Sequence, residues 1–103
     1  MGLKLNHIYP RAFIYKISYK DMKPYIGVCG RDTTILHVTR LHQQSKSLFD
    51  EALKDNQYPY IECLERFEDI KGTDLLRKEA EYSIECCSVN NYSNKHYKFE
   101  NNN

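Results

Sequence analysis

The stretch from Phe13 to Gly27 reads FIYKISYKDMKPYIG. Residues that favour β-structure stand at both of its ends, and the polar segment 19–23 between them is typical of a turn. Two short strands joined by such a segment form an antiparallel hairpin. The stretch therefore predicts a β-hairpin with Tyr15 in one strand and Tyr25 in the other.

The residues after the hairpin predict three helices and one more strand. A helix is predicted over about 33–44, where apolar residues recur at three-residue steps, and a second, short helix is predicted to start from a cap at Ser47. The alternating segment 58–67 indicates a third strand, and a last helix is predicted over about 75–86. The element order β-β-α-α-β-α predicts an α+β fold, in which helices flank a three-stranded antiparallel sheet.

The length of the chain indicates one small domain, and its net charge gives no general electrostatic attraction to nucleic acid. The chain has 103 residues, a mean hydropathy of −0.72 and a net charge of +1, from 15 basic and 14 acidic residues. Any basic surface must therefore be local. We expect a polar leader over 1–10, the folded domain over 11–92, and a disordered, asparagine-rich tail over 93–103.

Cysteine spacing and hydropathy bear on the compartment. The four cysteines include no Cys-x-x-Cys pair, so they predict neither a zinc site nor a disulfide framework. We therefore expect a reducing, intracellular setting: the cytoplasm, or the nucleus if the host is eukaryotic. No apolar run approaches the ~20 residues that cross a bilayer, and we expect no membrane partner.

The two tyrosines of the hairpin resemble a known motif. Residues 13–15 (Phe-Ile-Tyr) and 25–27 (Tyr-Ile-Gly) resemble the paired signature of the GIY-YIG nuclease family, with Phe13 where the family most often has glycine. The element order is also that of the family fold, and the resemblance spans about 13–92. It implies a metal-dependent endonuclease that hydrolyses phosphodiester bonds in DNA, as family members do in viral, mobile-element, repair or restriction settings.

The resemblance also assigns roles to single residues. It implies that Tyr15 is the catalytic base, that Tyr25 orients the water or the phosphate, and that Glu79 on the last helix holds Mg²⁺ or Mn²⁺. A tyrosine of pKa about 10 is a poor base unless nearby cations favour its phenolate, so the metal and an arginine are required neighbours. Glu81 stays an alternative to Glu79. The two lie about 200° apart around a helix, so only one can face the sheet.

The arginine and histidine of the family signature are displaced in this chain. Arg40 can be the arginine that contacts phosphate, and His42 can be the histidine, if residues are inserted before them. The two insertions differ in length, so the two assignments exclude each other on an ideal helix. Arg31 and His37 are further candidates for these places.

Two functions therefore stay open. The first is a metal-dependent endonuclease that acts on double-stranded or branched DNA. The second is a catalytically degenerate GIY-YIG domain that only binds nucleic acid or a protein partner. The displacement of the arginine and the histidine favours this second function.

Overall fold

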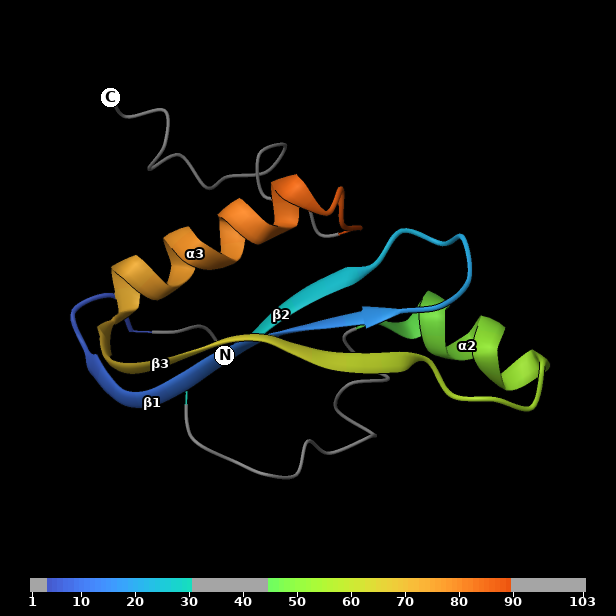
Figure 1. The fold of residues 1–103 in the computed structure, drawn as a ribbon, viewed down its shortest axis with the longest axis horizontal. Helices are drawn as coiled ribbons and strands as arrows, with labels where there is room; N and C mark the ends of the chain where they lie inside the picture. Colours follow the sequence, from blue (N-terminus) through green and yellow to red (C-terminus); the bar gives the residue numbers. More distant parts are fainter. Residues whose placement is uncertain (1–3, 31–44, 90–103) are drawn as a thin grey trace.

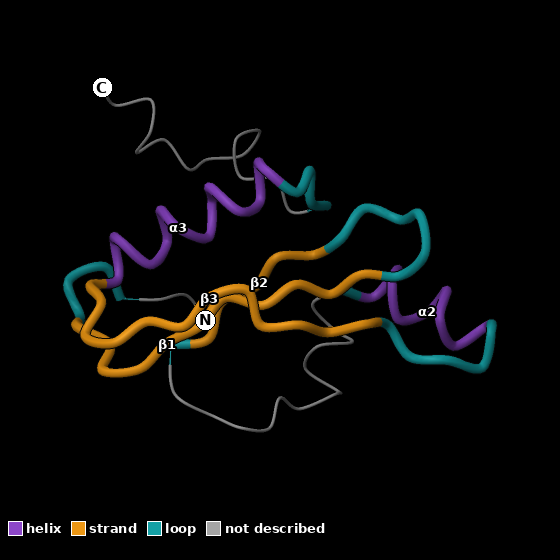
Figure 2. Tube along the Cα trace, viewed as in Figure 1, coloured by secondary structure: helices purple, strands orange, loops and turns teal. Residues whose placement is uncertain are grey.

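The computed structural model describes residues 4–30 and 45–89, and it shows the predicted α+β fold. A three-stranded antiparallel sheet carries two helices, as Figures 1 and 2 show. The elements are β1 (Ile8–Ser18), β2 (Tyr25–Cys29), α2 (Lys46–Lys54), β3 (Tyr60–Lys71) and α3 (Gly72–Glu85). The helix predicted over 33–44 and the tail predicted over 93–103 lie outside the described residues.

Strand β1 is the centre of the sheet, whose order is β2-β1-β3. It forms the predicted hairpin with β2, in a register that places Tyr15 opposite Gly27. It pairs with β3 along its whole length, from Ile8 opposite Lys71 to Ser18 opposite Tyr60, with a register shift between Ile14 and Tyr15. A central strand is covered on both faces, which explains why the four consecutive residues 12–15 are all buried.

Alternate residues of β1 point to opposite faces of the sheet and divide the core into two clusters. On one face, Phe13, Tyr15 and Ile17 pack with residues of α2. On the other face, Ala12 and Ile14 pack with Leu75 of α3. The two helices therefore cover opposite faces, and Figure 1 shows α3 along one side of the sheet and α2 near the turn of the hairpin.

Both ends of α3 are fixed to the rest of the domain. At its start, the backbone N–H of Gly72 donates to the carbonyl of His7 (2.9 Å), and a Cβ on Gly72 would collide with the carbonyl of Lys4. Beyond its end, the N–H of Val89 donates to the carbonyl of Pro24 (2.8 Å), immediately before β2. Helix α3 is thereby held in place over the hairpin.

Four predicted boundaries were wrong, and backbone hydrogen bonds explain each one. Strand β3 runs over Tyr60–Lys71 instead of 58–67, because its last residues pair with Ile8–Arg11 of β1. Strand β1 begins at Ile8, inside the predicted leader, because these residues continue the ladder with β3. Helix α2 is capped at Ser45 instead of Ser47, since two amides of the first turn donate to the Ser45 carbonyl. Helix α3 begins at Gly72, three residues earlier than predicted, because the first amides of the helix have acceptors in residues 5–7.

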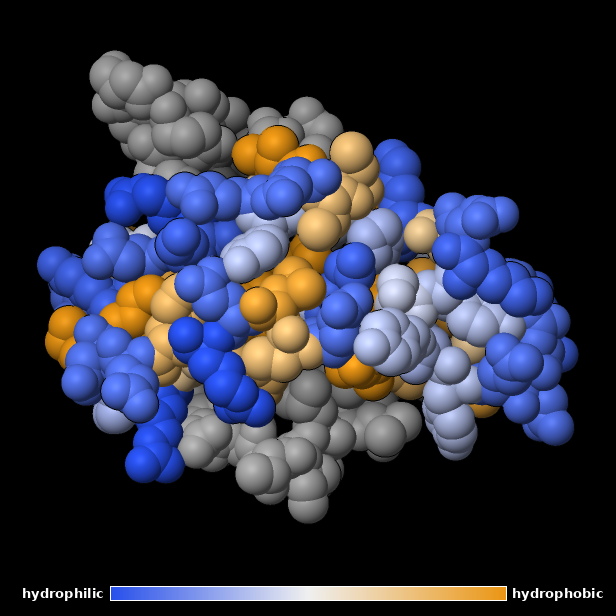
Figure 3. Space-filling view, in the orientation of Figure 1, coloured by the Kyte–Doolittle hydropathy of each residue, from blue (hydrophilic) through white to orange (hydrophobic). Residues whose placement is uncertain are grey.

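The surface is largely hydrophilic on the face seen in Figure 3, where apolar side chains gather in a band between α3 and the strands. Neither α2 nor α3 is long and apolar enough to cross a membrane.

Candidate active site

Tyr15 and Tyr25 are neighbours across the hairpin, as the resemblance predicts for a shared site. Their ring centroids lie 6.4 Å apart, with an angle of 41° between the ring planes. Both rings belong to the face of the sheet that α2 covers. Tyr15 is 4% exposed and Tyr25 is half-buried.

Gly27 provides the space for the ring of Tyr15. A Cβ atom on Gly27 would lie closer than 3.0 Å to the Cζ, Oη and Cε1 atoms of Tyr15. Tyr25 and Gly27 are two residues apart in a strand and so share a face. The sequence Tyr-Ile-Gly thus places the phenol of Tyr25 on this face. Two residues further along the strand, Gly27 leaves a space that the phenol of Tyr15 fills.

Two further side chains extend this row of rings toward β3. The ring of Phe13 lies 6.1 Å from the ring of Tyr15, and the guanidinium carbon of Arg66 lies 5.3 Å from the centroid of the Phe13 ring. The sequence analysis did not select Arg66. Nothing in its local sequence signals this position, because the register between β1 and β3 creates it.

Glu79 is the buried carboxylate of α3. Its residue is 3% exposed, whereas Glu81 is exposed and lies 4.0 Å from the ammonium nitrogen of Lys78. Of the two carboxylates that the sequence left as alternatives, Glu79 is therefore the one on the covered side of the helix. It follows Leu75 by one helical turn, on the side that packs against the sheet.

The three proposed catalytic side chains come from two layers. Tyr15 and Tyr25 lie on the α2 face, and Glu79 belongs to α3 on the other face. Helix α3 packs mainly against β2, which is an edge strand of the described sheet. Arg31, His37, Arg40 and His42 lie outside the described residues.

The metal-binding capacity of the described part rests on single carboxylates. Among residues 4–30 and 45–89, no three His, Cys, Asp or Glu side chains gather as a metal site. Mg²⁺ keeps several of its waters and is commonly held by one or two carboxylates together with substrate phosphates. The single carboxylate of Glu79 fits that chemistry and does not fit a closed zinc site.

The hydroxyl groups of two other tyrosines donate hydrogen bonds to carboxylates. A tyrosine that acts as a base needs nearby cations instead. The hydroxyl of Tyr82 donates to Glu65 (2.7 Å), and this hydrogen bond raises the pKa of Tyr82 to about 12. The hydroxyl of Tyr19 donates to Asp55 (2.5 Å), which likewise raises the pKa of Tyr19. A carboxylate acceptor favours the neutral phenol. Each of the two tyrosines therefore links two distant segments of the chain through its hydrogen bond.

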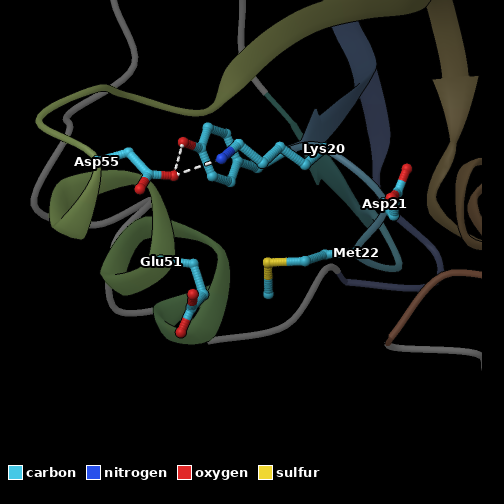
Figure 4. Close-up of a pocket in the computed structure, with 6 residues that line it drawn as sticks. Lys20, Asp21, Met22, Glu51 and Asp55 are labelled. Atoms are coloured by element: carbon cyan, nitrogen blue, oxygen red, sulfur yellow. Dashed lines mark hydrogen bonds and ion pairs between the residues drawn. The ribbon is translucent and has the colours of Figure 1, made fainter.

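The hydrogen bond between Tyr19 and Asp55 lies beside an open pocket at the turn of the hairpin. Asp55, at the end of α2, accepts a hydrogen bond from the Tyr19 hydroxyl. It also binds the ammonium group of Lys20 (2.7 Å), as Figure 4 shows. The pocket is lined by Tyr19, Lys20, Asp21, Met22, Glu51 and Asp55. It contains none of the predicted site residues. Its contacts join α2 to the hairpin turn, so we assign it a structural role.

Comparisons of this chain with protein-family models, curated proteins and solved structures find no match.

Proposed function

We propose that this protein is a GIY-YIG-type endonuclease that hydrolyses phosphodiester bonds in DNA with Mg²⁺ or Mn²⁺. The observation that carries the proposal is the packing of Tyr15 against Gly27 beside the ring of Tyr25. This contact gives a physical reason for a tyrosine in one strand and Tyr-x-Gly in the other. The motif therefore corresponds to two neighbouring phenol rings on one face of the hairpin.

In this proposal Tyr15 is the base and Tyr25 is the orienting residue. The Tyr15 oxygen, as its phenolate, takes a proton from water as the water oxygen bonds to phosphorus. The bond from phosphorus to the leaving oxygen breaks, and that oxygen takes a proton from a solvent water. Glu79 would hold the metal, which when bound stabilises the charge that develops on the phosphate. Because a phenol has a pKa near 10, Tyr15 depends on nearby positive charge to work at neutral pH.

The edge of the sheet at β2 is the place where these side chains could act on one phosphate. Strand β2 carries Tyr25 and Gly27, and α3 with Glu79 packs mainly on this strand. The hydrogen bond between Val89 and Pro24 fixes the end of α3 to the start of the same strand. These contacts support our proposal that the site lies along β2.

The second candidate function is the binding of nucleic acid without cleavage. The burial of the two central groups favours it, because Tyr15 is 4% exposed and Glu79 is 3% exposed. A base and a metal ligand must meet solvent and substrate during the reaction. If these side chains stay covered, they serve only the core.

A cleavage assay with matched variants separates the two functions. The purified protein is incubated with duplex and branched DNA in Mg²⁺ or in EDTA. We expect cleavage in Mg²⁺ alone and a loss of roughly 10²-fold or more in Tyr15→Phe. The control is Tyr58→Phe, which removes the same hydroxyl from a residue that is 70% exposed.

Circular dichroism of each variant checks that folding is intact. Equal cleavage in EDTA, or full activity in Tyr15→Phe, would contradict the mechanism. Binding of DNA with no cleavage in Mg²⁺ would select the second function.

A further inference from the structure

We propose that Tyr82 is a positioning residue for the metal site, because its hydrogen bond to Glu65 fixes the rotation of α3 and thereby the orientation of the Glu79 carboxylate. The inference rests on the proposed function, in which Glu79 holds the metal. Tyr82 acts through Glu79, so the inference can be tested by metal binding without cleavage.

Glu79 and Tyr82 lie on the same side of α3. Residues three apart are neighbours on the surface of a helix, about 60° apart around its axis. Glu79 is 3% exposed, and Tyr82 is half-buried against the cluster that contains Leu75. Both side chains therefore belong to the side of the helix that packs on the sheet. A rotation of α3 that moved the Tyr82 ring would also move the Glu79 carboxylate.

The Tyr82 hydroxyl joins α3 to a fixed point of the sheet. It donates to Oε1 of Glu65 on β3 at 2.7 Å. Glu65 is the register partner of Ile14, which is fully buried in the central strand. A carboxylate acceptor also makes this hydrogen bond stronger than one between neutral groups. The bond can therefore resist a rotation of the helix.

The backbone contacts of α3 lie at its ends, away from Glu79. The N–H of Gly72 donates to His7 at the start, and the N–H of Val89 donates to Pro24 beyond the end. Apolar packing along the helix is not directional, whereas a hydrogen bond requires a narrow range of distances and angles. Tyr82 adds such a directional contact within one helical turn of Glu79.

The rotation of α3 matters for a site that has one protein carboxylate. Glu79 and Glu81 lie about 200° apart around the helix, so a rotation that turns Glu79 away from the sheet does not at once bring Glu81 in. Mg²⁺ requires near-ideal octahedral geometry and short bonds to its oxygen ligands. The carboxylate of Glu79 must therefore be held in one orientation, and the link from Tyr82 to β3 provides this.

The test compares Tyr82→Phe with Tyr19→Phe by NMR titration with Mn²⁺, without DNA. Bound Mn²⁺ broadens the amide signals of nearby residues, so broadening at residues 78–80 reports binding at Glu79. Each variant keeps its ring and loses one hydrogen bond from a hydroxyl to a carboxylate. The bond that Tyr19→Phe removes lies on the opposite face of the sheet, beside α2.

We expect Tyr82→Phe to weaken Mn²⁺ binding about tenfold, which is the lower end of the loss that follows removal of a contact supporting a metal ligand. Tyr19→Phe should leave Mn²⁺ binding unchanged. Glu65→Gln keeps an acceptor for the Tyr82 hydroxyl and should lose less affinity than Tyr82→Phe. Urea unfolding shows that each variant is folded under the conditions of the titration.

The outcomes separate this inference from the proposed function. A loss in Tyr82→Phe that exceeds the loss in Tyr19→Phe supports the role of Tyr82, whether or not the parent cleaves DNA. Equal Mn²⁺ affinity in Tyr82→Phe and the parent, or equal losses in the two variants, would overturn that role and leave Glu79 as the ligand. A parent that shows no broadening at residues 78–80 would reject Glu79 as the ligand and overturn this inference with it.

Discussion

The ring of Tyr15 occupies the space that a side chain on Gly27 would need. The two residues are register partners on neighbouring strands, so neither can change without affecting the other. Glycine is usually unfavourable inside a strand, because its backbone loses more freedom on folding than that of other residues. Its presence here is explained by the ring that lies against it.

Gly27→Ala is expected to destabilise the protein. Without the ring, the change should stabilise the strand by about 0.5–1 kcal/mol. With the ring in place, the new methyl group overpacks this face of the sheet and should lower the free energy of unfolding by about 1–3 kcal/mol. It should also displace the Tyr15 hydroxyl and thereby lower any cleavage. Urea unfolding measures the free energy.

The control for this prediction is the same change in a Tyr15→Leu background. Removing the ring should relieve most of the cost of Gly27→Ala, which a double-mutant cycle reports as a coupling between the two sites. An equal cost in both backgrounds would show that the contact is not the cause.

Glu79→Gln is expected to remove metal-dependent activity, while Glu81→Gln is neutral. Both changes keep the size of the side chain and remove one negative charge from α3, but only Glu79 lies on the buried side. Loss of a group that acts on the developing charge typically lowers the rate by roughly 10²–10³-fold. Calorimetric titration with Mn²⁺ gives a second readout. Equal effects of the two changes would reject Glu79 as the ligand.

The hairpin could be predicted because its signals are local. Alternating β-formers and a polar turn lie within one short stretch, and the choice between Glu79 and Glu81 reduces to the geometry of one helix. The second half of β3 could not be predicted in the same way. Its residues 68–71, of which only Ile70 is apolar, join the sheet through backbone pairing with Ile8–Arg11, which the side-chain pattern of this segment does not report.

The position of Arg66 shows where prediction from sequence ends. It follows from the pairing of β1 with β3, including the register shift between Ile14 and Tyr15. Moving the register by one residue would place the arginine on the other face. The Arg40 and His42 assignments stay predictions, since both residues lie outside the described part of the chain.

Asp55→Asn is expected to remove an acid-sensitive part of the stability. The hydrogen bonds from Lys20 and Tyr19 lower the pKa of Asp55. The ionised form is therefore favoured in the folded protein. This stabilisation is present above the ordinary aspartate pKa of about 3.9 and is lost as the pH falls through the lowered value.

Urea midpoints at neutral and strongly acidic pH test this prediction. Asp55→Asn should be less stable than the parent at pH 7, and the two should converge in acid. The control is Asp21→Asn, at the far side of the same pocket from Asp55 (Figure 4). A difference that persists at low pH would mean that Asp55 stabilises the fold without its charge.

The end of α3 carries a cysteine in a backbone conformation that favours glycine. Cys87 has a φ of 53°, and its N–H donates to the carbonyl of Ile84 (3.2 Å). The N–H of Ser88 donates to the carbonyl of Ser83 (3.0 Å). This pair of bonds is a Schellman motif, in which the residue at the position of Cys87 is usually glycine.

Cys87→Gly is therefore expected to stabilise the protein by roughly 0.5–1 kcal/mol, because relief of the left-handed strain outweighs the added freedom of the unfolded chain. Cys86→Gly is the matched control. It removes the same thiol from the preceding residue, which has a φ of −88° and packs half-buried against the α3-side core, so it should destabilise by about 1 kcal/mol or more. Urea unfolding under reducing conditions compares them. Destabilisation by both changes would mean that the Cys87 side chain contributes more than its backbone strain costs.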